Sequence, residues 1–183
     1  MQPSGALGSR RGDRSTGGVV IRSDWENQFV EYFRVRAQPL RRLAYALCGD
    51  WHTAEDLVQL TFVRLYRRWP RLRDESVDAY ARKIVVNAFL THRRDRRRES
   101  LMAEPPERAA GGADPAETLA IRRALADLAP RQRAAVVLRY LEDLPVTEVA
   151  ALLGITEGTV KSQTARAIQS MRTALHGAAL TRE

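Results

Sequence analysis

Residues 99–116 separate two parts of the chain that both carry helical periodicity. This stretch of 18 residues (ESLMAEPPERAAGGADPA) holds three prolines and two glycines and shows no apolar period. Because proline and glycine are poor residues for the interior of a helix or strand, such a stretch is typical of a linker. The sequence therefore predicts two small folding units, within residues 24–98 and 117–177, joined by a flexible linker.

Apolar residues recur at helical spacing on both sides of this linker, and no strand-like alternation competes with them. The expected helices before the linker begin near Trp25, Pro39, Thr53 and Val77. Those after it begin near Ile121, Pro130, Pro145 and Thr156, and the last continues to about Leu175. Proline suits the first turn of a helix, and threonine suits the N-cap position. We predict an all-α fold of two small helical bundles.

The composition of the two ends and the net charge of the chain limit which partners and which compartment are expected for it. Residues 1–23 are rich in Gly, Ser and Arg and predict a disordered leader, and residues 178–183 predict a tail. Lys and Arg number 30 against 22 Asp and Glu, a formal charge of +8. That excess favours nucleic acid or an anionic membrane surface as partner, with simple solubility as the alternative. No apolar run approaches the roughly 20 residues of a membrane span, so we expect a cytoplasmic protein without membrane insertion.

Residues 146–175 (VTEVAALLGITEGTVKSQTARAIQSMRTAL) have the pattern of a helix-turn-helix. A small residue at Ala150, a turn glycine at Gly154 and an apolar Val160 let two helices cross closely around a tight turn. The structural alternative is an αα-hairpin with a solvated polar face. The turn glycine, the Thr156 cap and the basic outward face favour DNA binding. The outward groups suited to phosphates and base edges are Thr159, Lys161, Ser162, Ala165 and Arg166.

Two helices of the first unit carry opposite charge. Between Arg82 and Arg98 there are seven basic residues and one acid, Asp95. Such a run neutralises phosphates, although a solvated charged face is the common alternative. Asn87 and Thr91 lie on the same helix, which favours a nucleic-acid face.

The helix expected from Thr53 instead begins with acids. Asp56 and the acidic residues near it are suited to contact with a basic protein partner. Acids in the first turn also compensate the helix dipole, and from charge alone this second explanation is the better one.

These segments resemble the extracytoplasmic-function sigma factors of bacterial RNA polymerase. The resemblance rests on GDWHTAEDLVQLTFVRLYRRW, DAYARKIVVNAFLTHRRDRRR and the helix-turn-helix, in this order over about residues 25–175. It implies that residues 24–98 bind the polymerase and melt the −10 promoter element. Residues 117–177 would then recognise the −35 element. The implied partners are core RNA polymerase, promoter DNA and an anti-sigma factor, with no cofactor or metal.

The resemblance also assigns roles to single residues. Asp56 and Gln59 match positions that face the polymerase clamp. Asn87 matches the residue beside the pocket for a flipped −10 base, and Thr91, Arg93 and Arg94 are expected to contact the same element. Lys161, Ser162, Ala165 and Arg166 match groove-facing positions. Leu60, Tyr80 and Thr91 stand where the family often has Glu, Trp and Asp.

Two other classes of function are less well supported. A helix-turn-helix regulator of the two-component or quorum type is the alternative, but it needs an upstream receiver or ligand domain, whereas residues 25–98 are helical and basic. An enzyme finds no support, because the three histidines lack a triad or ligand context. Cys48, the single cysteine, excludes an intrachain disulfide and is interpreted as a core or helix-end residue rather than a redox sensor.

Overall fold

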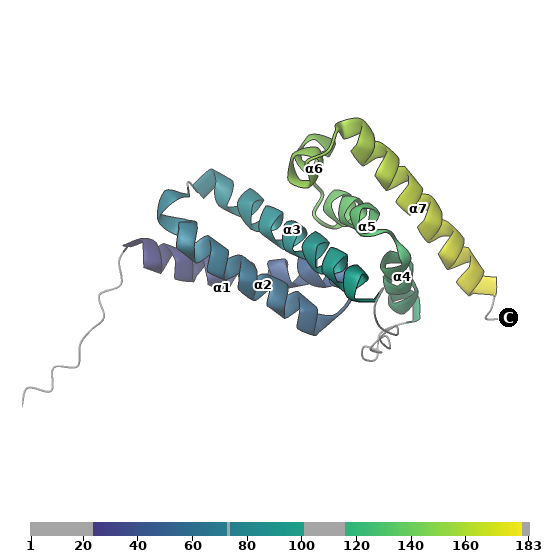
Figure 1. Ribbon diagram of the computed structural model, residues 1–183, viewed down its shortest axis with the longest axis horizontal. Helices are drawn as coiled ribbons and strands as arrows, with labels where there is room; N and C mark the ends of the chain where they lie inside the picture. Colours follow the sequence, from purple (N-terminus) through teal and green to yellow (C-terminus); the bar gives the residue numbers. More distant parts are fainter. Residues whose placement is uncertain (1–23, 73, 101–115, 181–183) are drawn as a thin grey trace, which may run out of the picture.

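The computed structural model describes residues 24–72, 74–100 and 116–180, and their regular structure is entirely helical (Figure 1). The first bundle consists of α1 (Asp24–Cys48), α2 (Trp51–Arg68), the short 3-10 helix η1 (Trp69–Arg71) and α3 (Asp74–Ser100). The second consists of α4 (Ala116–Asp127), α5 (Pro130–Val136), the π-helical turn η2 (Val137–Leu141), α6 (Val146–Leu153) and α7 (Glu157–Leu180). The all-α fold is therefore confirmed. The predicted leader and most of the predicted linker lie outside the described residues.

The sequence predicted that a new helix begins near Pro39, but Pro39 lies inside α1. Proline removes one backbone hydrogen bond from a helix interior, at a cost of about 3 kcal/mol. The helix continues because Leu40, Leu43 and Leu47 extend the buried stripe beyond the proline, with exposed fractions of 6%, 1% and 0%. Burial of these three side chains outweighs the local preference, so α1 is one helix of 25 residues.

The cap of α2 also differs from the prediction. Asp50, not Thr53, is the N-cap, and its Oδ2 accepts a hydrogen bond from the Thr53 backbone nitrogen at 2.8 Å. Hydrogen bonds from the Thr53 side chain and backbone lower the pKa of the Asp50 carboxyl. Gly49, with φ of +77°, supplies the left-handed turn that separates α1 from α2.

An aromatic cluster fixes the N-terminal half of α1 on α2 and η1. The Phe29 ring meets Phe62, Tyr66 and Trp69 edge-on, with ring centroids 6.2, 5.1 and 5.2 Å apart. Edge-to-face pairs of this kind stabilise beyond the area they bury. None of the described helices is both long and apolar enough to cross a lipid bilayer.

The two bundles pack against each other and share one apolar core. That core extends from Leu40 in α1 through Phe89 in α3 to Val149 and Val160 in the second bundle. Helix α3 contacts α5 and α6, and α1 contacts α4, α5 and η2. Figure 1 shows α7 on the outer side of the second bundle, away from the first. The sequence predicted the two bundles but not this packing.

Candidate nucleic-acid interface

The turn between α6 and α7 has the geometry of a helix-turn-helix. Gly154 ends α6 in the left-handed conformation, with φ of +63°, and its backbone nitrogen bonds to the Ala150 carbonyl oxygen. The Thr156 Oγ1 accepts a hydrogen bond from the Thr159 backbone nitrogen at 3.2 Å, which confirms the predicted cap. Val149 and Val160 are fully buried, so α6 and α7 pack closely at their crossing. α7 continues to Leu180, beyond the predicted end near Leu175.

The outward face of α7 carries most of the predicted −35 residues in exposed positions. Lys161, Ser162, Ala165 and Arg166 are all exposed. Thr159 is half-buried, and its hydroxyl lies 2.8 Å from that of Thr156, so it belongs partly to the cap. The Ser162 hydroxyl donates to the Thr159 carbonyl oxygen at 3.0 Å. A basic, exposed N-terminal half of a helix is suited to insertion into a major groove.

Helix α3 brings three of the four predicted −10 residues onto one exposed face. Asn87, Thr91 and Arg94 are exposed and follow each other at spacings of four and three, which places them on one side of a helix. Lys83, one turn before Asn87, is exposed on the same side. Lys83 belongs to the basic run between Arg82 and Arg98, but no contact was predicted for it, although its spacing of four residues from Asn87 places it on this face. The face therefore combines an amide, a hydroxyl and two positive charges.

Arg93 lies apart from this face. At 100° per residue it points about 120° away from Asn87 around α3. Its Nε is buried without a hydrogen-bond partner among the described residues. Arg93 also lies near enough to Arg133 of the second bundle for its positive charge, after burial, to help lower the pKa of the Arg133 guanidinium. The structure thus does not bring Arg93 together with the other three.

Helix α2 presents a separate exposed stripe, which we call the α2 stripe: Asp56, Gln59, Leu60 and Val63. Glu55, beside it, forms an ion pair with Arg41 of α1, whereas the Asp56 carboxylate lies 3.9 Å from the His52 Nδ1 of its own helix. Leu60 and Val63 are 38% and 48% exposed. The two polar residues were predicted from the sequence and the apolar pair was not. Leu60 follows Asp56 by four residues and Val63 follows Gln59 by four, and this spacing places all four side chains on the same side of the helix. A stripe that joins exposed apolar side chains to an acid fits a protein partner better than DNA.

Comparison with known families covers both bundles. Residues 33–99 match the family described as sigma-70 region 2, and residues 118–171 match sigma-70 region 4. The first match includes the α2 stripe and the exposed face of α3. The second includes α6, the turn after it and the first part of α7, with the exposed residues Lys161 to Arg166.

Curated relatives extend the match over most of the chain. The RNA polymerase sigma-E factor of Streptomyces avermitilis is 40% identical over 151 residues, which cover 79% of this chain and 83% of the relative. The ECF RNA polymerase sigma factor SigM of Mycobacterium tuberculosis is 36% identical over 144 residues, covering 76% and 72%.

A solved structure has the same arrangement of helices. The sigma factor RpoE of Bartonella quintana, in complex with the anti-sigma factor NepR, superposes with a TM-score of 0.71 at 26% identity, over 82% of this chain and 98% of that one. The helix-turn-helix, the two matched regions and these relatives together show that the chain belongs to the extracytoplasmic-function group of RNA polymerase sigma factors.

Proposed function

We propose that this sigma factor docks on core RNA polymerase through the α2 stripe, recognises −35 DNA with α7 and opens the −10 element with α3. The observation that carries the proposal is the separation of three exposed faces with different chemistry on one chain. The α2 stripe is apolar and acidic, whereas the faces of α3 and α7 are polar and basic. Three such faces allow one protein and two DNA segments to be bound at once.

The docking step depends on Leu60 and Val63 as well as on the acid. Apolar side chains at the centre of an interface supply most of its affinity, and surrounding charges speed association and set its orientation. Asp56 and Gln59 border the apolar pair and would meet basic residues of the polymerase clamp.

The DNA steps divide between the bundles. Lys161 and Arg166 supply the charge for phosphate and base contacts at the −35 element, with Ser162 and Ala165 between them in the groove. On α3, the Asn87 amide offers donors and an acceptor to the Watson–Crick edge of an extruded base. Thr91 and Arg94 lie next to it and would hold the adjacent backbone.

An anti-sigma factor is a further proposed partner. The Bartonella quintana sigma factor is bound to one, and this chain has the same fold over both bundles. A protein that covers the α2 stripe would compete directly with the polymerase.

Capture by immobilised core polymerase tests the docking surface. Leu60→Asp with Val63→Asp should reduce affinity at least tenfold, because charges replace the apolar centre of the interface. Asp56→Arg with Gln59→Ala should also abolish capture. Val35→Asp is the matched control, since Val35 is 58% exposed on α1 outside the α2 stripe. All variants should keep the helical content of wild type. Wild-type capture by both double variants would remove the stripe from the polymerase interface.

Binding without polymerase tests the alternative of an independent helix-turn-helix regulator. We expect the free protein to bind promoter fragments weakly and core polymerase to confer tight, specific binding, because the complex fixes both bundles at the required separation. Tight sequence-specific binding by the protein alone at physiological salt would favour the regulator.

A further inference from the structure

Trp51, the first residue of α2, presents a large aromatic ring to solvent. Its exposed fraction is 49%, whereas Trp69 of the aromatic cluster is 8% exposed. The indole stacks on the Tyr45 ring of α1, with ring centroids 4.0 Å apart and an angle of 19° between the ring planes. Tyr45 covers one face of the indole, so the exposure of Trp51 belongs to the opposite face and the ring edges. A flat aromatic surface is thus held open at the start of α2.

The first bundle alone holds this ring in place. Asp50, which precedes Trp51, is the N-cap of α2, and the left-handed turn at Gly49 joins α2 to the last turn of α1. Tyr45 lies in that last turn. The stack therefore does not depend on the second bundle. A side chain already fixed by its neighbours loses little rotamer freedom on binding, and tryptophans of this kind supply much of the affinity of protein interfaces.

The stack also indicates which group suits the open face. The Arg122 guanidinium of α4 lies over the Tyr45 ring, 4.9 Å from its centroid. Because Trp51 occupies one face of Tyr45, Arg122 occupies the other, and the order of layers is guanidinium, phenol, indole. A cation is attracted to the electron density of an aromatic face, and indole attracts it more strongly than phenol does. The open face of Trp51 is therefore suited to a second cation.

Carboxylates beside Trp51 favour a basic protein side chain over nucleic acid. Residues 50–59 hold three acids, Asp50, Glu55 and Asp56, and no Lys or Arg. Such a stretch repels phosphates, so stacking on a nucleic-acid base is disfavoured. Glu55 follows Trp51 by four residues, which places both on one side of α2. Arginine fits this pair because its planar guanidinium stacks on an aromatic face and donates to a carboxylate in its own plane.

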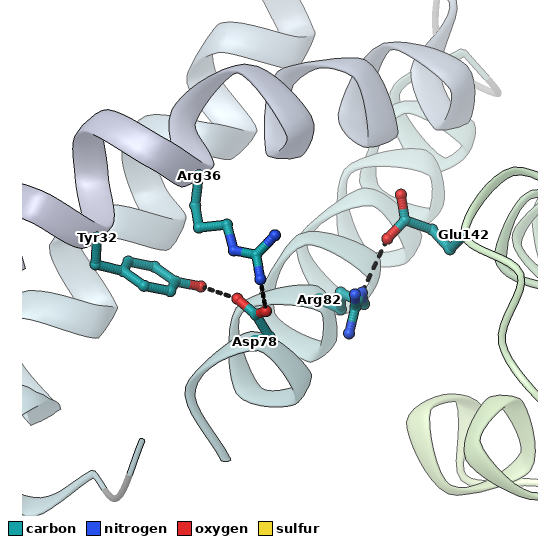
Figure 2. A network of polar contacts seen from close by, with 5 residues as sticks. All are labelled: Tyr32, Arg36, Asp78, Arg82 and Glu142. Atoms are coloured by element: carbon teal, nitrogen blue, oxygen red, sulfur yellow. Dashed lines mark hydrogen bonds and ion pairs between the residues drawn. The ribbon is translucent and has the colours of Figure 1, made fainter. Parts of the chain in front are cut away.

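The Glu55 carboxylate is accessible to a partner. Two other carboxylates are bonded to groups of this chain (Figure 2): that of Asp78 to Tyr32 and Arg36, and that of Glu142 to Arg82. Their side chains are 32% and 19% exposed, whereas that of Glu55 is 47% exposed. Glu55 pairs with Arg41 at the surface, and a surface ion pair contributes little stability. An incoming guanidinium can therefore share or replace Arg41 at small cost.

We propose that Trp51 and Glu55 bind an arginine side chain of core RNA polymerase, at what we call the Trp51 site. The guanidinium stacks on the open face of the indole and donates to the Glu55 carboxylate. The site adjoins the α2 stripe, because His52, next to Trp51, has its Nδ1 3.9 Å from the Asp56 carboxylate. A polymerase surface that covers the stripe therefore reaches Trp51 as well. The inference rests on the proposed function for the identity of the partner.

Fluorinated tryptophans at position 51 test the stacking. Fluorine draws electron density from the ring face and leaves its shape nearly unchanged, so it weakens attraction to a cation but not apolar contact. With one to four fluorine atoms, incorporated at this position alone, affinity for core polymerase should fall stepwise, by roughly three- to tenfold at the end of the series. The same analogues at Trp25 are the matched control, because that ring lies at the start of α1 and packs on Tyr66. An unchanged affinity over the series would overturn the site.

Trp51→Leu separates stacking from simple apolar contact. Leucine keeps an apolar side chain but has no aromatic face, so affinity should fall roughly tenfold while circular dichroism shows wild-type helical content. A loss with leucine but not with fluorination would mean that Trp51 makes an apolar contact only, which overturns the binding of arginine.

Two neutral variants test the carboxylate. Glu55→Gln should lower the affinity for core polymerase roughly three- to tenfold, because the guanidinium loses a charged acceptor. Arg41→Gln breaks the same surface ion pair but keeps the carboxylate, so this variant should bind at least as tightly as wild type. Equal losses in both variants would assign Glu55 to the ion pair with Arg41 and overturn its role in the Trp51 site.

The outcomes separate this inference from the proposed function. Normal binding by the fluorinated proteins and by Glu55→Gln, with capture lost when Leu60 and Val63 are changed to Asp, removes the Trp51 site and leaves the α2 stripe as the docking surface. Loss on fluorination, with wild-type capture by both double variants of the stripe, supports the Trp51 site and removes the stripe. If the wild-type protein does not bind core polymerase, both fail.

Discussion

Arg133 Nη1 donates a hydrogen bond to the Leu47 carbonyl oxygen at 2.8 Å, across 86 positions of sequence. Leu47 lies in the last turn of α1, where carbonyl groups have no partner within the helix. The Arg133 Nη2 donates to Ala126 and Leu128, at the end of α4. One guanidinium therefore caps the C-termini of two helices, one from each bundle, and its positive charge complements both helix dipoles.

Arg133→Met should destabilise the protein by about 3 kcal/mol, because three carbonyl groups, two of them in buried hydrogen bonds, lose a charged donor. Methionine retains most of the apolar stem, so the loss reports the hydrogen bonds. Arg133 is 2% exposed, and burial lowers the pKa of its guanidinium to about 10, so it stays charged at neutral pH. Urea unfolding followed by circular dichroism measures the change. Arg131→Met, at an exposed position of the same helix, is the control. Equal midpoints for the two variants would contradict the capping role.

Asp50→Ala should reduce the free energy of unfolding by about 1 kcal/mol at neutral pH, the usual cost of a lost N-cap. The folded-state pKa of Asp50 is lowered from its ordinary value of 3.8, so its contribution is present above pH 3.8 and is lost as pH falls through the lower, folded value. The gap between wild type and the alanine variant should therefore narrow at pH 3. Asp50→Asn is the control, since an amide oxygen caps without titrating. An alanine variant as stable as wild type at pH 7 would show that the cap is dispensable.

Much of this fold follows from the sequence, and the failures have identifiable causes. The apolar spacing predicted the helices, but two helix starts, at Pro39 and Thr53, were wrong. Local preference favours both residues at a helix start, whereas the burial of Leu40 continues α1 past Pro39, and the Asp50 carboxylate, which accepts from the Thr53 backbone nitrogen, is the N-cap of α2. Such preferences amount to a few kcal/mol at most and yield to tertiary packing.

The contact between the bundles had no signal in the sequence. Arg133 and Glu142 resemble ordinary charged helix residues until their partners, Leu47 and Arg82, are placed beside them. Arg93 was grouped with Asn87 because both belong to one basic helix, whereas helical angle separates them. The α2 stripe could have been completed from spacing alone, because Val63 follows Leu60 by three residues.

Lys161 and Arg166 should have different effects on −35 recognition. Five residues apart, they diverge by about 140° around α7 and cannot contact the same base pair. If Arg166 contacts a base, Arg166→Ala should cost about 1–3 kcal/mol at one or two positions of the element and relax sequence preference there. Lys161→Ala should weaken binding to all sequences alike and reduce the salt slope by about one. Selection of random −35 sequences by holoenzyme measures both. Unchanged selection by the double variant would exclude α7 from sequence recognition.

Asn87→Ala should separate strand opening from every other step of initiation. Asparagine is a poor residue for an exposed helix interior, so alanine should stabilise the free protein by about 0.5 kcal/mol, and a purely structural role predicts no loss of function. If the Asn87 amide instead holds an extruded base, its loss should destabilise the open promoter by about 1–3 kcal/mol, or roughly five- to 150-fold in its population. Permanganate reactivity of thymines at the −10 element measures that population, while polymerase capture and −35 binding should remain at wild-type levels. Arg97→Ala, an exposed change farther along α3, controls for general loss of charge and surface. A template mismatched over the −10 element offers the base already unpaired, and the defect should shrink on it because the unstacking cost is removed. Normal opening of the fully paired promoter by Asn87→Ala would assign this residue to the helix surface alone.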